Sequence, residues 1–170
     1  HILSTSGAHL VLAESATATG ATATAHNVGP IAKKFNSTTN FAFPTGDSTS
    51  YNPISLQPQS TSAATFSVEY HFTPPSNPTN LADGLVKISE VEYWDITRTA
   101  GSTDGIVGLV WDTESEIIVP DSLEVVFWDG TNWRDAGSNN ITYSSLDNGS
   151  LNSNSNLNTF NKVTFGTKSV

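Results

Sequence analysis

The chain has 170 residues, enough for one domain with a hydrophobic core but too few for two full-sized domains. It contains no cysteine, which excludes disulfide bonds, thiolate metal sites and thiol nucleophiles. Sixteen acidic residues against seven basic ones give a net charge of -9, which opposes binding to nucleic acid and to anionic lipid.

The first 25 residues combine a short apolar strand with a low-complexity tract. The strand is predicted from His9 to Ala13, with Leu10, Val11 and Leu12 at its centre. Residues 16–25 alternate alanine with threonine, and such small side chains bury little on either face of a strand. We therefore expect an extended segment over 1–25 and a main domain over 26–170.

Several short strands are predicted in the next part of the chain. They cover 28–35, 41–43, 51–56 and 65–72, separated by turn residues and prolines. The last of them alternates most clearly, with Phe66, Val68, Tyr70 and Phe72 on one face. This alternation is typical of a strand that is half buried against a core.

A longer strand is predicted over 86–97, and its apolar residues change face midway. Val86 and Ile88 do not share the alternation of the residues that follow, so we expect a bulge near Ser89 and Glu90. The stretches 106–111 and 123–128 are apolar at almost every position, which favours central strands.

Three further features complete the chain. Residues 129–132 predict a hairpin turn, 147–158 form a loop rich in asparagine and serine, and 160–165 form a last strand. No stretch has helical periodicity with capping signals. The pattern predicts an all-β fold, an antiparallel β-sandwich of about ten short strands preceded by the extended N-terminal segment.

Several pieces of the sequence resemble a β-sandwich domain that recurs in large secreted surface proteins of Bacteroidota, many of them exported by the type IX secretion system. These pieces are Gly29 to Lys34, Phe41 to Gly46, Tyr51 to Ile54, Val91 to Thr99 and Val125 to Trp133. The residues before Gly29 are similar to the family's lead-in, which resembles one turn of a β-solenoid. The resemblance implies a secreted, extracellular or cell-surface protein, and it implies no catalytic site.

The sequence lacks the common catalytic motifs. There is no Gly-x-Ser-x-Gly, no His-Glu-x-x-His and no glycine-rich phosphate loop, and the four histidines are scattered through the first 71 residues. Glu114 and Glu116 are spaced like a glycosidase pair, about 6 to 7 Å apart on a strand. Nothing nearby supplies a second chemical role, so we expect no enzyme and no required cofactor.

Two kinds of ligand site are candidates in the second half of the chain. Asp112, Glu114, Glu116 and Asp121 offer oxygen ligands for Ca²⁺, although a solvated acidic edge that discourages strand pairing is the favoured explanation. Of the tryptophans, only Trp133 is expected to be exposed, where it would stack on a sugar ring. The others are expected in the core.

Ser48 and Ser122 follow aspartate in short segments that resemble the O-glycosylation signal of Bacteroidota. They are therefore candidate glycan carriers in a secreted protein.

Two functions follow from these observations. In the first, the chain is a structural or adhesive module that forms a homopolymer, because Leu10, Val11 and Leu12 pair with a neighbouring copy; the alternative is that this strand folds back onto its own domain. In the second, the chain is a carbohydrate-binding module that takes a polysaccharide at Trp133. A passive spacer is a third alternative.

Overall fold

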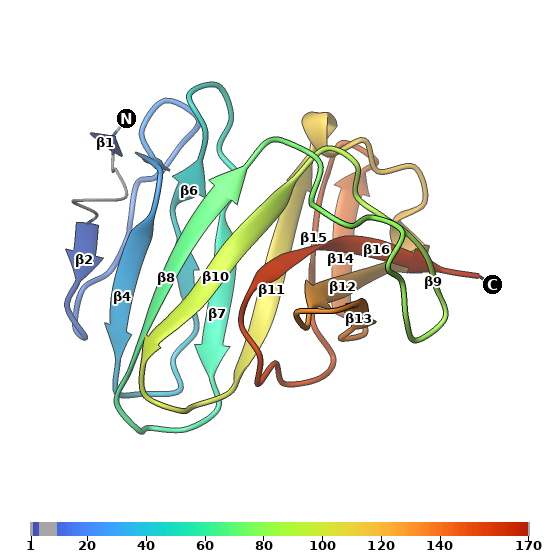
Figure 1. The fold of residues 1–170 in the computed structure, drawn as a ribbon. Helices are drawn as coiled ribbons and strands as arrows, with labels where there is room; N and C mark the ends of the chain where they lie inside the picture. Colours follow the sequence, from blue (N-terminus) through green and yellow to red (C-terminus); the bar gives the residue numbers. More distant parts are fainter. Residues whose placement is uncertain (1, 4–9, 170) are drawn as a thin grey trace.

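The computed structural model describes residues 2–3 and 10–169, and it shows an all-β protein (Figure 1). The described residues form sixteen strands and two short 3-10 helices. The strands are β1 (Ile2–Leu3), β2 (Leu10–Leu12), β3 (Asn27–Val28), β4 (Ile31–Phe35), β5 (Phe41–Phe43), β6 (Thr45–Gly46), β7 (Ile54–Pro58), β8 (Ala64–His71), β9 (Leu85–Ile88), β10 (Tyr93–Ala100), β11 (Gly105–Asp112), β12 (Leu123–Trp128), β13 (Trp133–Asp135), β14 (Asn139–Ser145), β15 (Asn148–Asn152) and β16 (Lys162–Lys168). The 3-10 helices are η1 (Thr113–Ser115) and η2 (Pro120–Ser122).

The strands form three sheets. The largest has eight strands, in the order β13-β12-β16-β10-β8-β4-β2, with β9 also paired to β16. The second has five antiparallel strands, in the order β14-β15-β11-β7-β5. The third consists of the parallel strands β1, β3 and β6.

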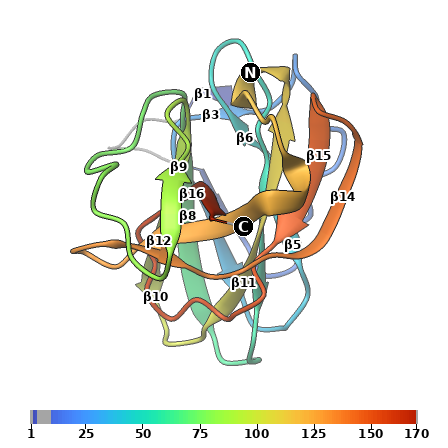
Figure 2. The same ribbon diagram turned by 90° about the vertical axis from the view of Figure 1, so that its right-hand side faces the viewer.

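The two larger sheets share one hydrophobic core. Phe66 and Trp94 from the eight-stranded sheet belong to the same buried cluster as Leu109 and Trp111 from the five-stranded sheet. Figure 2 shows β9 and β10 on one side of the molecule and β14 and β15 on the other. A large shared core is the expected source of stability for a chain without disulfide bonds.

The N-terminal strand pairs within its own chain. β2 lies parallel to β4, with Leu10 opposite Ile31 and Leu12 opposite Lys33. The eight-stranded sheet is therefore mixed, and the expectation of a purely antiparallel fold was wrong at this edge. A parallel pair needs a long connection, and the 18 residues from Ala13 to Pro30 supply it.

The strand with the clearest alternation was predicted almost to the residue. β8 runs from Ala64 to His71 and buries every second side chain, including Phe66, Val68 and Tyr70. Phe72 lies beyond the strand and is 47% exposed, so the buried face ends at Tyr70, two residues earlier than predicted.

The strand expected over 86–97 is divided in two. β9 ends at Ile88 and β10 begins at Tyr93, and both pair with the same side of β16. The chain takes six residue steps from Ile88 to Trp94 while β16 takes three, from Gly166 to Val163. The predicted bulge is thus an insertion of three residues, which interrupts the strand.

The region expected to be a loop contains a strand. β15 covers residues 148–152 and pairs with β11, where Gly149 lies opposite Trp111. A Cβ atom at Gly149 would overlap the ring of Trp111, so glycine is required there for the tryptophan to enter the core. The polar composition of 147–158 concealed this contact.

Candidate functional site

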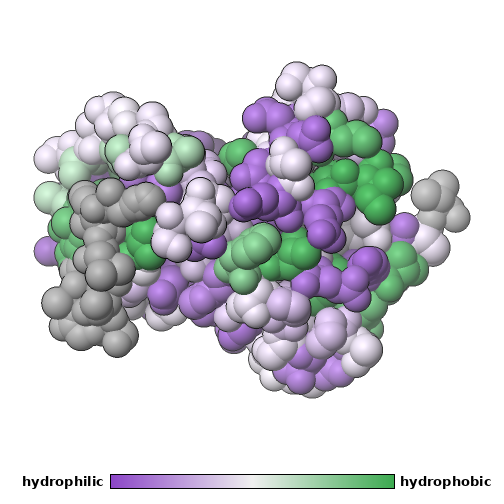
Figure 3. Space-filling model, turned by 90° about the horizontal axis from the view of Figure 1, so that it is seen from above, coloured by the Kyte–Doolittle hydropathy of each residue, from purple (hydrophilic) through white to green (hydrophobic). Residues whose placement is uncertain are grey.

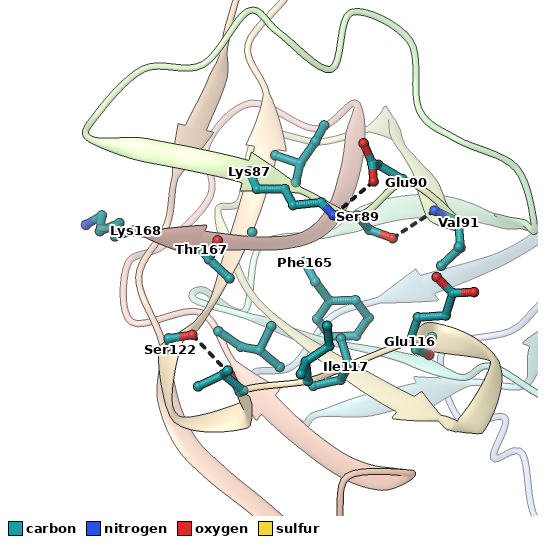
Figure 4. A pocket seen from close by; sticks show the side chains of 16 residues that line it. Lys87, Ser89, Glu90, Val91, Glu116, Ile117, Ser122, Phe165, Thr167 and Lys168 are labelled. Carbon is teal, nitrogen blue, oxygen red and sulfur yellow. Dashed lines mark hydrogen bonds and ion pairs between the residues drawn. The ribbon is translucent and has the colours of Figure 1, made fainter. Parts of the chain in front are cut away.

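An apolar groove of about 390 Å³ opens at the end of the molecule that carries the C-terminus. It lies between the β9–β16 pair and the segment around η1 and η2 (Figure 4). Ile117 and Phe165 point into it, and Ile118 and Val119 line it while remaining 79% and 57% exposed. Figure 3 shows hydrophobic surface gathered at this end.

The groove follows from two local features of the chain. The interruption of the β9–β10 strand brings Ser89, Glu90 and Val91 to one wall. The opposite wall begins after η1, where Glu116 has a φ of 56° and turns the chain toward Ile117. The left-handed backbone at Glu116 ends the short helix and directs the following aliphatic residues along the groove.

Polar groups lie mainly at the rim of the groove. Lys87 Nζ pairs with Glu90 Oε2 at 2.9 Å, and both side chains are well exposed. The Ser89 hydroxyl accepts hydrogen bonds from the backbone N–H groups of Val91 and Glu92 at 3.2 and 3.3 Å. These bonds fix the wall and leave the interior of the groove to aliphatic and aromatic side chains.

A buried carboxyl group lies directly behind this wall. Glu92 is fully buried, and Tyr70 donates its hydroxyl to Glu92 Oε2 at 2.8 Å. Asn52 Nδ2 is 3.5 Å from the same oxygen, and the Thr164 hydroxyl donates to the Glu92 carbonyl at 2.6 Å. Among the described residues, none is hydrogen bonded to Glu92 Oε1 or to Asn52 Oδ1.

Burial raises the pKa of Glu92 to about 7. The hydroxyl groups of Ser115 and Tyr70 favour the ionised form and oppose this shift, while the charges of Asp112 and Glu114 add to it. No ion pair in the described part of the chain involves Glu92. A buried carboxylate without a cation is costly, so the neutral acid is the favoured form up to about neutral pH.

Sequence reasoning missed Glu92, although a signal was present. Glu92 has the same parity as Trp94 and Ile96, both of which are buried on the inner face of β10. A glutamate that continues the inward face of a strand is a signal of a buried acid.

A second groove, of about 420 Å³, lies beside the N-terminal segment at the other end of the molecule. Its lining includes Leu10, Leu12 and Ala18 from the N-terminal segment and Ile31 from β4. Leu12 and Ala18 also pack against the main hydrophobic core, so the N-terminal segment is part of the folded body.

Lys33 fastens this segment to the main body. Its Nζ donates to the carbonyl oxygens of Ala13 and Glu14 at 2.8 and 2.9 Å, and it lies 4.9 Å from the ring centre of Phe41. Burial lowers the pKa of Lys33, although the nearby Glu14 acts in the opposite direction. Sequence reasoning missed this contact, because lysine in a strand is usually solvated.

The four acidic residues considered for Ca²⁺ are not brought together. Asp112 Oδ1 accepts from the Glu114 backbone N–H at 2.9 Å and so caps η1. Asp121 Oδ1 accepts from the Tyr143 hydroxyl at 3.1 Å, and Glu116 is exposed at the groove. No cluster of three or more histidine or acidic side chains suited to a metal is found in residues 2–3 and 10–169.

Trp133 is fully buried, so the expectation of an exposed, sugar-stacking tryptophan was wrong. Its indole N–H donates to the Ser76 carbonyl at 3.3 Å, and its ring lies 5.6 Å from that of Trp128. Backbone bonds tie it to Asn80 and Ala82. The proline-rich loop after β8 folds back over β13, and this long-range contact was not visible in the local pattern.

The two serines considered for glycosylation lie in different settings. Ser48 is exposed in the loop after β6, where Asp47 Oδ1 accepts backbone hydrogen bonds from Thr49 and Ser50. Ser122 lines the groove and donates its hydroxyl to the Val119 carbonyl at 3.0 Å.

The fold and the groove define an all-β, β-sandwich-like protein with an apolar groove at one end and the short parallel strand β2 at the edge of its large sheet at the other. Comparison with known protein families, curated proteins and solved structures found no match for this chain. Within the described residues there is no helix of the length and hydropathy that spanning a membrane requires.

Proposed function

We propose that this chain is a non-catalytic structural or adhesive module of the extracellular space or cell surface, which assembles with copies of itself through its N-terminal strand. In this proposal residues 26–170 are a β-sandwich, and 1–25 are a solenoid-like extended segment. The resemblance to surface-protein domains of Bacteroidota favours the secreted setting.

The observation that carries the proposal is the way β2 is held. Among the described residues, Leu10, Val11 and Leu12 pair with β4, and this parallel pairing is slightly less stable than antiparallel pairing. Leu10 and Val11 are 37% and 49% exposed at the edge of the sheet. An apolar strand at a sheet edge is suited to pairing between molecules.

Oligomerisation tests this function directly. Sedimentation velocity and electron microscopy of the whole chain are expected to show oligomers or filaments that grow with concentration. A chain that remains monomeric at its highest soluble concentration would refute the proposal.

A matched pair of variants links assembly to β2. Val11→Asp is expected to reduce oligomers while the chain stays folded, because Val11 is 49% exposed. The control is Phe72→Asp, at a residue that is 47% exposed beyond the end of β8. Equal assembly by the two variants would show that β2 is not the assembly element.

The carbohydrate-binding alternative depended on an exposed Trp133, and Trp133 is buried. Trp133 is part of the protein interior and is held on several sides, so it presents no ring to a sugar. We therefore propose no polysaccharide site.

A further inference from the structure

The end groove is lined by exposed aliphatic side chains. Ile118 and Val119 stand at 79% and 57% exposure beside an apolar space of about 390 Å³. Contiguous apolar patches on soluble proteins commonly mark a surface that another chain covers. The groove is therefore a candidate docking surface.

We infer that this groove is the acceptor for Leu10, Val11 and Leu12 of a second copy, which leave their place beside β4 and dock between the β9–β16 pair and Ile117–Val119. The inference rests on the proposed function and names the surface that the N-terminal strand meets. The contact is heterologous, because the donor and acceptor surfaces differ, and repeated copies would form an open chain.

The two surfaces lie at opposite ends of the molecule. β2 lies at the end that carries the N-terminus, while β9 and the last strand, β16, lie at the opposite end (Figure 1). This arrangement favours contact between copies over contact within one copy. A neighbour aligned end to end brings the two surfaces together.

The chemistry of the two surfaces matches. Residues Leu10 to Ala13 carry no charge, and the interior of the groove is formed by apolar side chains such as Ile117, Leu123 and Phe165.

The connection to the main body allows this movement. The tract from Ala13 to Ala25 is rich in alanine and threonine, and extended it would span about 40 Å. Exchange of a terminal element between copies is a common route to self-association.

Disulfide cross-linking tests the contact, and the absence of native cysteine makes each engineered thiol unambiguous. Two chains, one carrying Val11→Cys and the other Ile118→Cys, are mixed, unfolded, refolded together and oxidised. A disulfide forms only when the two Cα atoms come within about 7 Å. We expect a covalent heterodimer at least about tenfold more abundant than with Phe72→Cys in place of Ile118→Cys, as for a specific contact.

The outcomes separate this inference from the proposed function. Oligomers that form without preferential linkage of Val11→Cys to Ile118→Cys would overturn the groove as acceptor while leaving assembly intact. A chain that stays monomeric would overturn both. Ile118→Asp gives a second measurement. Ile118 lies on the surface, so the variant should fold. Assembly should fall at least about tenfold, because the variant loses aliphatic contacts with the docked strand.

Discussion

Tyr70 donates its phenolic hydroxyl to the carboxyl group of Glu92 at 2.8 Å, in a region where Glu92 has no access to solvent. The contact joins β8 to the segment that interrupts β9 and β10, which is also one wall of the groove. The protonation state of Glu92 therefore bears on the stability of both the core and the groove wall.

The first prediction concerns Glu92 and pH. Because the folded protein raises the pKa of Glu92 from 4.5 to about 7, the folded state binds this proton more tightly than the unfolded state. Its contribution is fully present below pH 4.5 and is lost as the pH rises through about 7, a difference of roughly 3 kcal/mol. Glu92→Gln should remove this part of the pH dependence and be the more stable protein near pH 8.

Urea unfolding at about pH 5 and about pH 8 measures this effect, and Glu90→Gln is the control. The Glu90 side chain is 68% exposed, so its loss should change stability little. A Glu92→Gln protein that loses stability between the two pH values as the parent does would show that Glu92 does not change its protonation state between them.

Local alternation predicted much of the fold, because in a half-buried strand every second residue is apolar and faces the core. Phe66 and Val68 are buried as their alternation indicates, and the turn at 129–132 does join β12 to β13. The site depends on contacts between distant segments, such as Tyr70 with Glu92 and Lys33 with Ala13. Such contacts produce no regular pattern of apolar and polar residues, so they could not be predicted from the sequence.

Trp133 is a second residue whose position local sequence could not predict. Its local setting, after a polar turn and before Arg134, is typical of an exposed residue. Its burial is decided by the loop containing Ser76 and Asn80, more than fifty residues earlier in the chain. The acidic run after Trp111 was likewise interpreted from spacing, whereas capping of η1 determines where Asp112 points.

The second prediction is that Trp133→Ala lowers the stability of the folded protein. Removing a fully buried tryptophan is expected to cost about 3 to 5 kcal/mol, because it leaves a cavity beside Trp128 and removes the bond to Ser76. Trp128→Ala, at a half-buried position, should cost less. Thermal unfolding of both variants provides the comparison, and an unchanged midpoint for Trp133→Ala would contradict the buried position.

The third prediction concerns Gly149. Gly149→Ala places a Cβ atom against the ring of Trp111 and should destabilise the protein by about 1 to 3 kcal/mol, since the core has no free space there. Gly84→Ala is the contrast: nothing lies near its added Cβ, and its φ of +79° costs about 1 kcal/mol. Near-ultraviolet circular dichroism should change for the Gly149 variant alone, because only that change displaces an aromatic ring.

The fourth prediction concerns Lys33. Substitution of Lys33 distinguishes assembly that requires β2 to leave β4 from assembly in which β2 stays paired with β4. Lys33→Met keeps an apolar stem but removes the bonds to Ala13 and Glu14, each worth about 1.5 to 3 kcal/mol for a charged donor. The N-terminal strand should leave β4 more often, so hydrogen exchange at residues 10–14 should speed up and cross-linking of Val11→Cys to Ile118→Cys should increase. Lys34→Met, at the exposed neighbouring position, should change neither. If Lys33→Met instead weakens assembly, β2 mediates assembly while still paired with β4. Loss of the Lys33 bonds promotes assembly only where β2 must first leave β4.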